Sequence, residues 1–307
     1  MILVFGTICL DRVRRVPHMP EPGGYVEVIS EQFVLGGEAA NTACALKEWG
    51  AAFVLAGNGL GEGPMSDLLR SALQERGLAP GEDHIVCPGA TPVCDVFVSD
   101  SGERTMIGLG FSAMRDTVDP SKLPFVPGER FTAEPNMGEV ARDAVRLAHA
   151  AGMKTYTMDF VDESDPVYPG SFWQASTDWA GARGDTGANV EWVRRRIAKH
   201  GCFSILSDGS NGFVAGSPDL PPRPYPPYPL SGVVDATGAG DLFRAGMLFG
   251  IDQAWPIGRC LQFASAAGCL ACRSLGATTS IPSRPEIEAL IAANPEISRE
   301  YERDNSA

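Results

Sequence analysis

A glycine-rich stretch, Asp235-Ala236-Thr237-Gly238-Ala239-Gly240-Asp241, leads into a long apolar run that predicts a buried helix. Backbone amides at a helix start have no partner inside the helix, and glycines let a ligand approach them. The amides of Gly238, Ala239 and Gly240 are therefore a candidate anion hole, above all for phosphate. A carboxylate beside a phosphate site repels the charge of its ligand, so its presence there needs a chemical reason. A base that takes a proton from an attacking hydroxyl supplies that reason. We therefore expect Asp241 to be such a base.

A second glycine pair, in Gly36-Gly37-Glu38-Ala39-Ala40-Asn41, offers a place where a sugar could bind. The glycines allow close approach of the backbone, and Asn41 carries both a donor and an acceptor for sugar hydroxyls. Asp11 follows the first predicted strand, where it could accept hydrogen bonds from two neighbouring hydroxyls. The two motifs would make one site if the fold brings them together.

The glycine turn and a pair of cysteines also allow purely structural explanations. In the turn, the glycines would serve chain reversal, and Asp235 or Asp241 would cap the next helix. Cys269 and Cys272 form a CxxC pair, which could be a redox or zinc site. The pair lies in an alanine-rich helical stretch with no second pair spaced for zinc, so we expect buried free thiols.

Gly57, Gly59 and Gly61 are similar to a dinucleotide-binding fingerprint, which would indicate a dehydrogenase. The third glycine falls one position early, and no strand with an acidic end follows about twenty residues later. A GxxxxGK[ST] loop is also missing from the sequence. Phosphate would therefore bind at the later glycine turn.

Runs with strand composition alternate with helical patterns that stop at glycines, which implies an α/β fold with a mostly parallel sheet covered by helices. We expect strands at residues 2–6, 53–57, 154–160 and 203–207 and one that ends at Val234, and helices at 39–49, 65–76, 139–151, 189–200, 239–252, 257–275 and 284–293.

Residues 12–35 and 91–111 alternate in the manner of strands around turns at 21–24 and 101–102. They predict hairpins inserted into a single domain of residues 1–307, where a small second sheet could act as a lid. Residues 217–230 hold seven prolines and predict a stiff connector, with an exposed polyproline helix as the alternative. The polar tail, residues 296–307, is expected to fray.

The net charge of -13 and the sequence pI near 4.8 argue against nucleic acid or an anionic membrane surface as a partner. A small metabolite fits better. Eight cysteines lie mostly in apolar segments, as free thiols do in a reducing compartment, so we expect a cytoplasmic protein. The apolar opening, residues 1–10, has no basic n-region and is too short to span a bilayer.

Two motifs resemble the signatures of the ribokinase-like, or PfkB, carbohydrate kinases. Residues 234–243 (VDATGAGDLF) are similar to the C-terminal signature, and residues 36–43 (GGEAANTA) to the N-terminal one. Shorter similarities follow the family's order along nearly the whole chain, at residues 6–11, 101–105, 207–212 and 276–277.

The resemblance implies an ATP-dependent kinase that phosphorylates a hydroxymethyl group of a sugar or nucleoside, with Mg²⁺ accompanying the nucleotide. It implies a three-layer α/β/α sandwich with a small β-sheet lid, through which a homodimer could form. By position, Asp241 is similar to the catalytic base, and the amides of Gly238, Ala239 and Gly240 to the anion hole. Implied further are substrate contacts from Asp11, Gly36, Gly37, Asn41 and Arg104, nucleotide contacts from Ser207, Gly209, Gly212, Ala264 and Gly268, and a monovalent cation, K⁺, near Asp235 and Thr237.

The chain departs from the family at its NxxE motif, whose glutamate acts on magnesium and phosphate through water. Residues 182–185 are the corresponding region, where Asp185 offers a shorter carboxylate and no asparagine precedes it. Asp185 is the expected Mg²⁺ contact through water. Because the NxxE motif is missing, a non-catalytic sugar- or nucleotide-binding protein is an alternative.

A nucleoside such as adenosine or inosine is the alternative substrate within the kinases. A base would stack on aromatic side chains of the lid. The candidates, which could instead fill the hairpins' own core, are Tyr25, Phe33, Phe97 and Phe111.

Overall fold

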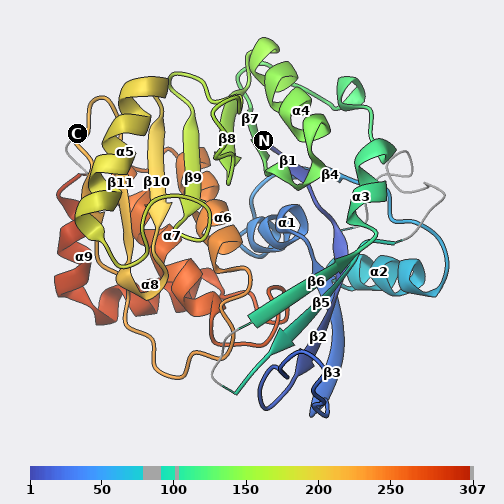
Figure 1. The fold of residues 1–307 in the computed structure, drawn as a ribbon. Coiled ribbons are helices and arrows are strands. Elements are labelled where there is room, and N and C mark those ends of the chain that lie inside the picture. Colours follow the sequence, from blue (N-terminus) through green and yellow to red (C-terminus); the bar gives the residue numbers. More distant parts are fainter. Residues whose placement is uncertain (79–90, 101–103, 305–307) are drawn as a thin grey trace.

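The structure is a computed structural model that describes residues 1–78, 91–100 and 104–304. An eight-stranded sheet forms its centre, in the order β12-β11-β10-β9-β8-β7-β1-β4 (Figure 1). Six neighbouring strands from β10 to β4 are parallel, and β11 and β12 are antiparallel. Their bounds are β1 Ile2–Gly6, β4 Phe53–Gly57, β7 Arg130–Ala133, β8 Lys154–Met158, β9 Phe172–Ser176, β10 Phe203–Ser207, β11 Phe213–Gly216 and β12 Arg223–Tyr225.

Helices bury both faces of this sheet. Successive side chains of a strand point to opposite faces, so each strand contributes to both cores. In β1, Ile2 and Val4 join the large core under α1, α6 and α7, whereas Leu3 and Phe5 join the core under α4. These layers form the expected three-layer sandwich (Figure 1). The helices are α1 Glu38–Glu48, α2 Pro64–Glu75, α3 Phe111–Met114, α4 Glu139–Ala150, α5 Thr186–His200, α6 Ala239–Asp252, α7 Ile257–Ala271, α8 Arg284–Ala293 and α9 Pro295–Glu302.

A second, four-stranded sheet lies to one side of the sandwich, at the lower right of Figure 1. Its order is β3-β2-β5-β6, and β2 and β5 pair in parallel, so the two segments predicted as hairpins lie side by side. The turn predicted at Ser101-Gly102 lies outside the described residues. The strands are β2 Cys9–Arg15, β3 Ser30–Gly36, β5 Val93–Val98 and β6 Arg104–Leu109.

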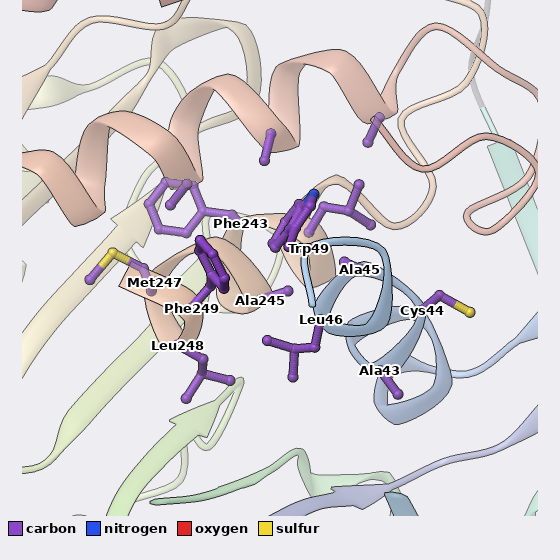
Figure 2. Packing of buried hydrophobic residues seen from close by; sticks show 14 of the residues in the cluster. Ala43, Cys44, Ala45, Leu46, Trp49, Phe243, Ala245, Met247, Leu248 and Phe249 are labelled. Carbon is purple, nitrogen blue, oxygen red and sulfur yellow. The ribbon is translucent and has the colours of Figure 1, made fainter. Parts of the chain in front are cut away.

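Trp49 fixes α1 against α6 and α7 (Figure 2). Its ring meets Phe263 edge-on, with centroids 5.1 Å apart, and Phe249 at 5.9 Å. The indole N–H donates to the carbonyl of Pro282 at 2.9 Å. Such aromatic pairs add to the hydrophobic stabilisation of the core. The helix that carries Asn41 is therefore held against the helix that carries Asp241.

Two expectations about the C-terminal half and one alternative are wrong. Val233 and Val234 form no strand: both are exposed, and the Val234 amide donates to Cys272 across a loop. The proline-rich segment is no exposed helix, because it contains edge strand β12 and buries Tyr225. The tail does not fray before Glu302, because α9 buries Tyr301 completely against the core.

No helix in the described ranges has the length and apolar character that a bilayer crossing requires.

Candidate active site

The glycine turn at the start of α6 is held in place by Asp235. This buried carboxylate accepts hydrogen bonds from the Thr237 amide (2.9 Å) and hydroxyl (2.6 Å) and from the Gly276 amide (2.9 Å). Gly238 then adopts a φ of 80°, and a Cβ on it would lie 2.5 Å from the Cβ of Ala277. Only glycine fits this position. The turn leaves Gly240 exposed at the first turn of α6, where amides lack intrahelical partners.

Asp241 follows this turn with its carboxylate buried and held on both oxygens. Oδ2 accepts a hydrogen bond from Asn41 Nδ2 at 2.8 Å, and Oδ1 accepts one from Arg244 Nη2 at 3.2 Å. The contact to Asn41 joins the two motifs, which lie 200 positions apart in the sequence. The condition for a single site is therefore met.

The pKa of Asp241 is raised to about 6: burial is the main cause and Glu134 adds to it, against the lowering effect of Arg244, the Asn41 hydrogen bond and Arg104. A group with such a pKa is largely ionised at neutral pH, yet close enough to it to accept a proton. The exposed Arg104 at the start of β6 therefore influences the site through its charge.

Asp11 lies in the same neighbourhood, on β2 of the small sheet. Burial raises its pKa to about 7, the Cys9 thiol lowers it through a hydrogen bond, and the charges of Asp241 and Asp235 raise it. Its carboxylate lies against Gly36, where a Cβ would come within 2.1 Å of it. Gly37 caps α1, and its carbonyl accepts the Asn41 amide at 2.8 Å. Asp11, Asn41 and Asp241 thus converge from three elements.

Comparison of the sequence with known protein families identifies the family of this chain. The sequence profile of the pfkB family carbohydrate kinases matches residues 1–124 and 177–284. The chain belongs to this family. The prediction of an ATP-dependent carbohydrate kinase is thereby confirmed, and the dehydrogenase alternative is wrong.

Relatives of this PfkB kinase match it over almost its whole length. An uncharacterised sugar kinase of Dictyostelium discoideum is 28% identical, over 95% of this chain and 98% of the relative. Among solved structures, Arabidopsis thaliana ribokinase complexed with ribose and ATP has a TM-score of 0.72 at 19% identity, covering 94% of this chain and 97% of that one. A nucleoside kinase of Burkholderia thailandensis in complex with inosine has a TM-score of 0.76 at 17% identity, covering 95% and 98%. These structures confirm the ribokinase-like fold.

The kinase places part of the predicted nucleotide set in one loop. Ser207 ends β10, and the loop to β11 contains Gly209 and Gly212. Asp208 ties this loop to its surroundings: it accepts hydrogen bonds from the Thr177 hydroxyl (2.8 Å) and the Gly184 amide (2.9 Å). The loop follows the carboxyl end of a parallel strand, where α/β folds bind ligands.

Two other predicted nucleotide residues lie between helices. Ala264 is fully buried on α7 and packs against Gly246 of α6, and Gly268 lets α7 approach the carbonyl of Ala239. Packing accounts for both residues. A direct nucleotide contact from either one stays a prediction.

The expected metal contacts have structural roles in the kinase. Asp185 caps α5 through the Ala188 amide at 2.9 Å, and Asp235 and Thr237 bond to each other in the turn. Among the described residues, no three His, Cys, Asp or Glu side chains are grouped so as to hold a metal ion. Mg²⁺ commonly takes one or two carboxylates and otherwise phosphate and water, so the carboxylates near the turn fit an ion that arrives with ATP.

The CxxC pair has ordinary contacts: Cys269 donates to the carbonyl of Tyr228 and Cys272 to that of Gly268. All described cysteines are free thiols.

Four charged residues near Asp241 were missed from the sequence. Arg244 lies one turn further along α6 and is fully buried. Glu38 begins α1, while Glu134 and Asp159 follow β7 and β8. Both Glu134 oxygens are used, for the amides of Thr7 and Asn136. An acidic residue directly after a strand of a parallel sheet would be the signal for Glu134 and Asp159, but β7 was not expected and the expected 154–160 strand included Asp159.

Proposed function

We propose that this kinase transfers the γ-phosphoryl group of ATP to a hydroxymethyl group of a sugar, with Asp241 as the general base. The observation that carries the proposal is the buried contact between Asp241 and Asn41 at the first turn of α6, beside Asp11. The contact supports the proposal because the candidate base, the candidate sugar-binding amide and the amides at the start of α6 lie together. The family and its ribokinase relatives agree with this chemistry.

In the transfer, Asp241 accepts the hydroxyl proton as the substrate oxygen attacks the γ-phosphorus. The new O–P bond forms, the bond between the γ-phosphorus and the bridging oxygen breaks, and ADP leaves. The amides at residues 238–240 donate hydrogen bonds to the phosphoryl oxygens as their charge develops. The Asn41 and Arg244 contacts keep the Asp241 carboxylate in one orientation.

Binding of both substrates is assigned to the residues around this centre. Asp11, Asn41 and the backbone at Gly36 and Gly37 would bind sugar hydroxyls, and Arg104 would contact the substrate from β6. Ser207, Gly209 and Gly212 would contact the nucleotide. Mg²⁺ would bind with ATP, and K⁺ would bind near Asp235 if the enzyme requires it.

A nucleoside substrate is less well supported by the lid. Phe33 and Phe97 pair with Arg12 and Arg14 across the small sheet, so they lie on the face opposite Asp11. Neither can stack on a base that Asp11 binds. Phe111 stays a candidate, because it packs on Gly108, which shares the face of Asp11.

An ADP-release assay over sugars and nucleosides, with Mg²⁺ and K⁺ present, tests the proposal. We expect turnover with at least one sugar. Turnover with nucleosides alone would favour the alternative substrate, and sugar binding without ADP release would indicate a non-catalytic homologue.

We further propose a cytoplasmic homodimer that forms through the outer face of the small sheet, defined by the exposed side chains of Phe33, Ile107 and Leu109. Phe33 and Ile107 share the face of Arg12 and Asp95, away from the site. Clustered exposed apolar side chains are typical of interaction surfaces.

A further inference from the structure

Several buried polar atoms around Asp241 have no hydrogen-bond partner within residues 1–78, 91–100 and 104–304. They belong to four side chains from three elements: Glu38 Oε2, Asn41 Oδ1, Asp159 Oδ1 and Arg244 Nη1. Buried polar atoms in proteins are almost always hydrogen-bonded, because leaving one unpaired destabilises the folded state. Such a concentration of them points to a ligand that supplies the partners.

Arg244 connects the members of this group. Its side chain is fully buried. Nη2 donates to the Glu38 carbonyl (2.6 Å) and to Asp241 Oδ1 (3.2 Å), and Nε donates to the Thr42 hydroxyl (3.0 Å). These bonds fix the guanidinium and leave Nη1 as a donor. Its charge also lowers the pKa of Glu38, Asp159 and Asp241, which burial raises, so all three carboxylates lie near it.

Asp159 is placed there by an unusual backbone. It follows β8 with a φ of 59°, in the left-handed region, and its amide donates to the Gln174 carbonyl at 2.8 Å. A non-glycine residue in this region is uncommon and often lies at a functional site. Together with Asp241, Glu38 and Asp159 bring three carboxylates around one buried guanidinium.

We propose that Glu38 and Asp159, with Arg244 between them, determine substrate specificity: they bind hydroxyl groups of an uncharged sugar beside the hydroxymethyl group that is phosphorylated, and they exclude sugars that carry phosphate or carboxylate. This inference rests on the proposed function.

The chemistry of the group favours hydroxyls. A hydroxyl donates to a carboxylate oxygen and accepts from a guanidinium, so one sugar can use both kinds of atom. An anionic group would gain one guanidinium that Asp241 already engages, and the ionised forms of Glu38 and Asp159 would repel it at low dielectric. Specificity of this kind comes from repulsion as well as attraction.

The test uses Glu38→Gln and Asp159→Asn, which keep the shape of each side chain and remove its ionisable carboxyl group. Glutamine can still accept the hydrogen bond from Asn136 Nδ2, and asparagine tolerates the left-handed backbone. Glu48→Gln is the matched control, because it removes one carboxylate from an exposed position on the same helix. Thermal melting confirms that each variant is folded.

Two readouts are compared for neutral pentoses and hexoses, ribose and fructose included, and for their 1-phosphates and ribonate. Calorimetry measures sugar binding without ATP, and ADP release gives KM and kcat. We expect Glu38→Gln and Asp159→Asn to weaken binding and raise the KM of the neutral sugar about 10- to 100-fold, with a much smaller change in kcat. Both variants should also reduce the preference for the neutral sugar over its phosphate. Glu48→Gln should change neither the KM of the neutral sugar nor this preference.

The inference is overturned if the wild-type enzyme binds sugar phosphates or ribonate as tightly as the neutral sugars. It is also overturned if both folded variants bind the neutral sugar as the wild type does. Absence of ADP release, with neutral-sugar binding that the two variants lose, would instead contradict the phosphoryl transfer and leave the specificity assignment standing.

Discussion

Asp241 stays ionised in a buried place because Asn41 and Arg244 hold its two oxygens. The same surroundings contain Asp11 and Asp159, for which burial raises the pKa to about 7. Clustered buried carboxylates destabilise the folded state, and such a cluster is typical of a functional site. Three predictions at the residue scale follow from their charges.

Asp241→Asn should lower kcat about 10²- to 10⁴-fold, because the amide cannot accept the hydroxyl proton. Asparagine keeps the volume and an oxygen for the Asn41 contact, so sugar binding should change little. Steady-state kinetics and calorimetry measure the two effects. Normal turnover by the folded variant would exclude Asp241 as the base.

The rate should depend on pH through the same carboxylate. Since the base acts only when ionised and its pKa is raised to about 6, kcat should be nearly constant above pH 7 and fall as the pH drops through 6. A pH profile of kcat at saturating sugar and ATP shows this. A profile that stays flat down to pH 5 would contradict the role of Asp241.

Asp11 should make the stability of the fold decrease with pH. Its pKa is raised from 3.8 to about 7, so the folded state keeps a proton that the unfolded state loses. The free energy of unfolding therefore falls as the pH rises from about 4 to 7, by an amount on the order of a few kcal/mol. Asp11→Asn should raise Tm at pH 8 and have little effect at pH 4.

The control for this measurement is Asp219→Asn, which removes an exposed carboxylate. Equal shifts of Tm at pH 8 for Asp11→Asn and Asp219→Asn would show that the burial of the Asp11 carboxylate does not destabilise the folded protein.

At the scale of elements, the glycine turn and the first turn of α6 act as one unit. Asp235 binds the turn at Thr237 and Gly276, while Gly238 fits against Ala277. The position of the helix amides therefore depends on contacts made on the far side of the turn.

Gly238→Ala should destabilise the protein by about 1–3 kcal/mol, because its φ of 80° and the close Ala277 leave no room for a methyl group. Turnover of the folded fraction should fall as well, since the amides move. Denaturant unfolding and kcat measure the two effects. Gly187→Ala is the control: this glycine of α5 has ordinary φ and only Asp185 Oδ1 nearby, at 3.5 Å, so alanine should not destabilise the helix.

Elements with strong patterns could be predicted from the sequence. The 2–6 and 53–57 strands and the 239–252 helix are confirmed to the residue, because glycines end the two apolar strands and mark the start of the helix. β7 and β9 were missed, since Arg130–Ala133 and Phe172–Ser176 are short and carry few β-branched residues. The helix α9 was missed because its exposed face is polar, while burial of Tyr301 stabilises it.

The site could be predicted only where a motif marks it. The glycines marked Asp241 and Asn41, and both are at the site. Arg244 carries no such mark: on an apolar helix it gives no sign of its partners Glu38 and Thr42, about 200 positions away. Long-range pairing of single charges depends on the tertiary fold, which one sequence does not reveal.

At the scale of the whole molecule, the small sheet has two different faces. Its inner face carries Asp11 toward the site, and its outer face exposes Phe33, Ile107 and Leu109. One sheet could therefore cover the substrate and pair two molecules.

If the chain forms the proposed dimer, Ile107→Lys should shift it toward the monomer, because a charge in an apolar interface would be desolvated. Light scattering after gel filtration, over a range of protein concentrations, measures the mass. Leu147→Lys on α4 is the control, since it places the same charge on a similarly apolar position remote in the fold from β6. A wild-type chain that is monomeric at every concentration would contradict the proposed pairing.

The unpartnered atoms of Glu38, Asp159 and Arg244 have a consequence for the resistance of the protein to proteolysis. A ligand that satisfies them binds only the folded state and so reduces the unfolded population that proteases attack. The steady-state amount of the enzyme should therefore rise with the supply of its own sugar, without any change in gene expression.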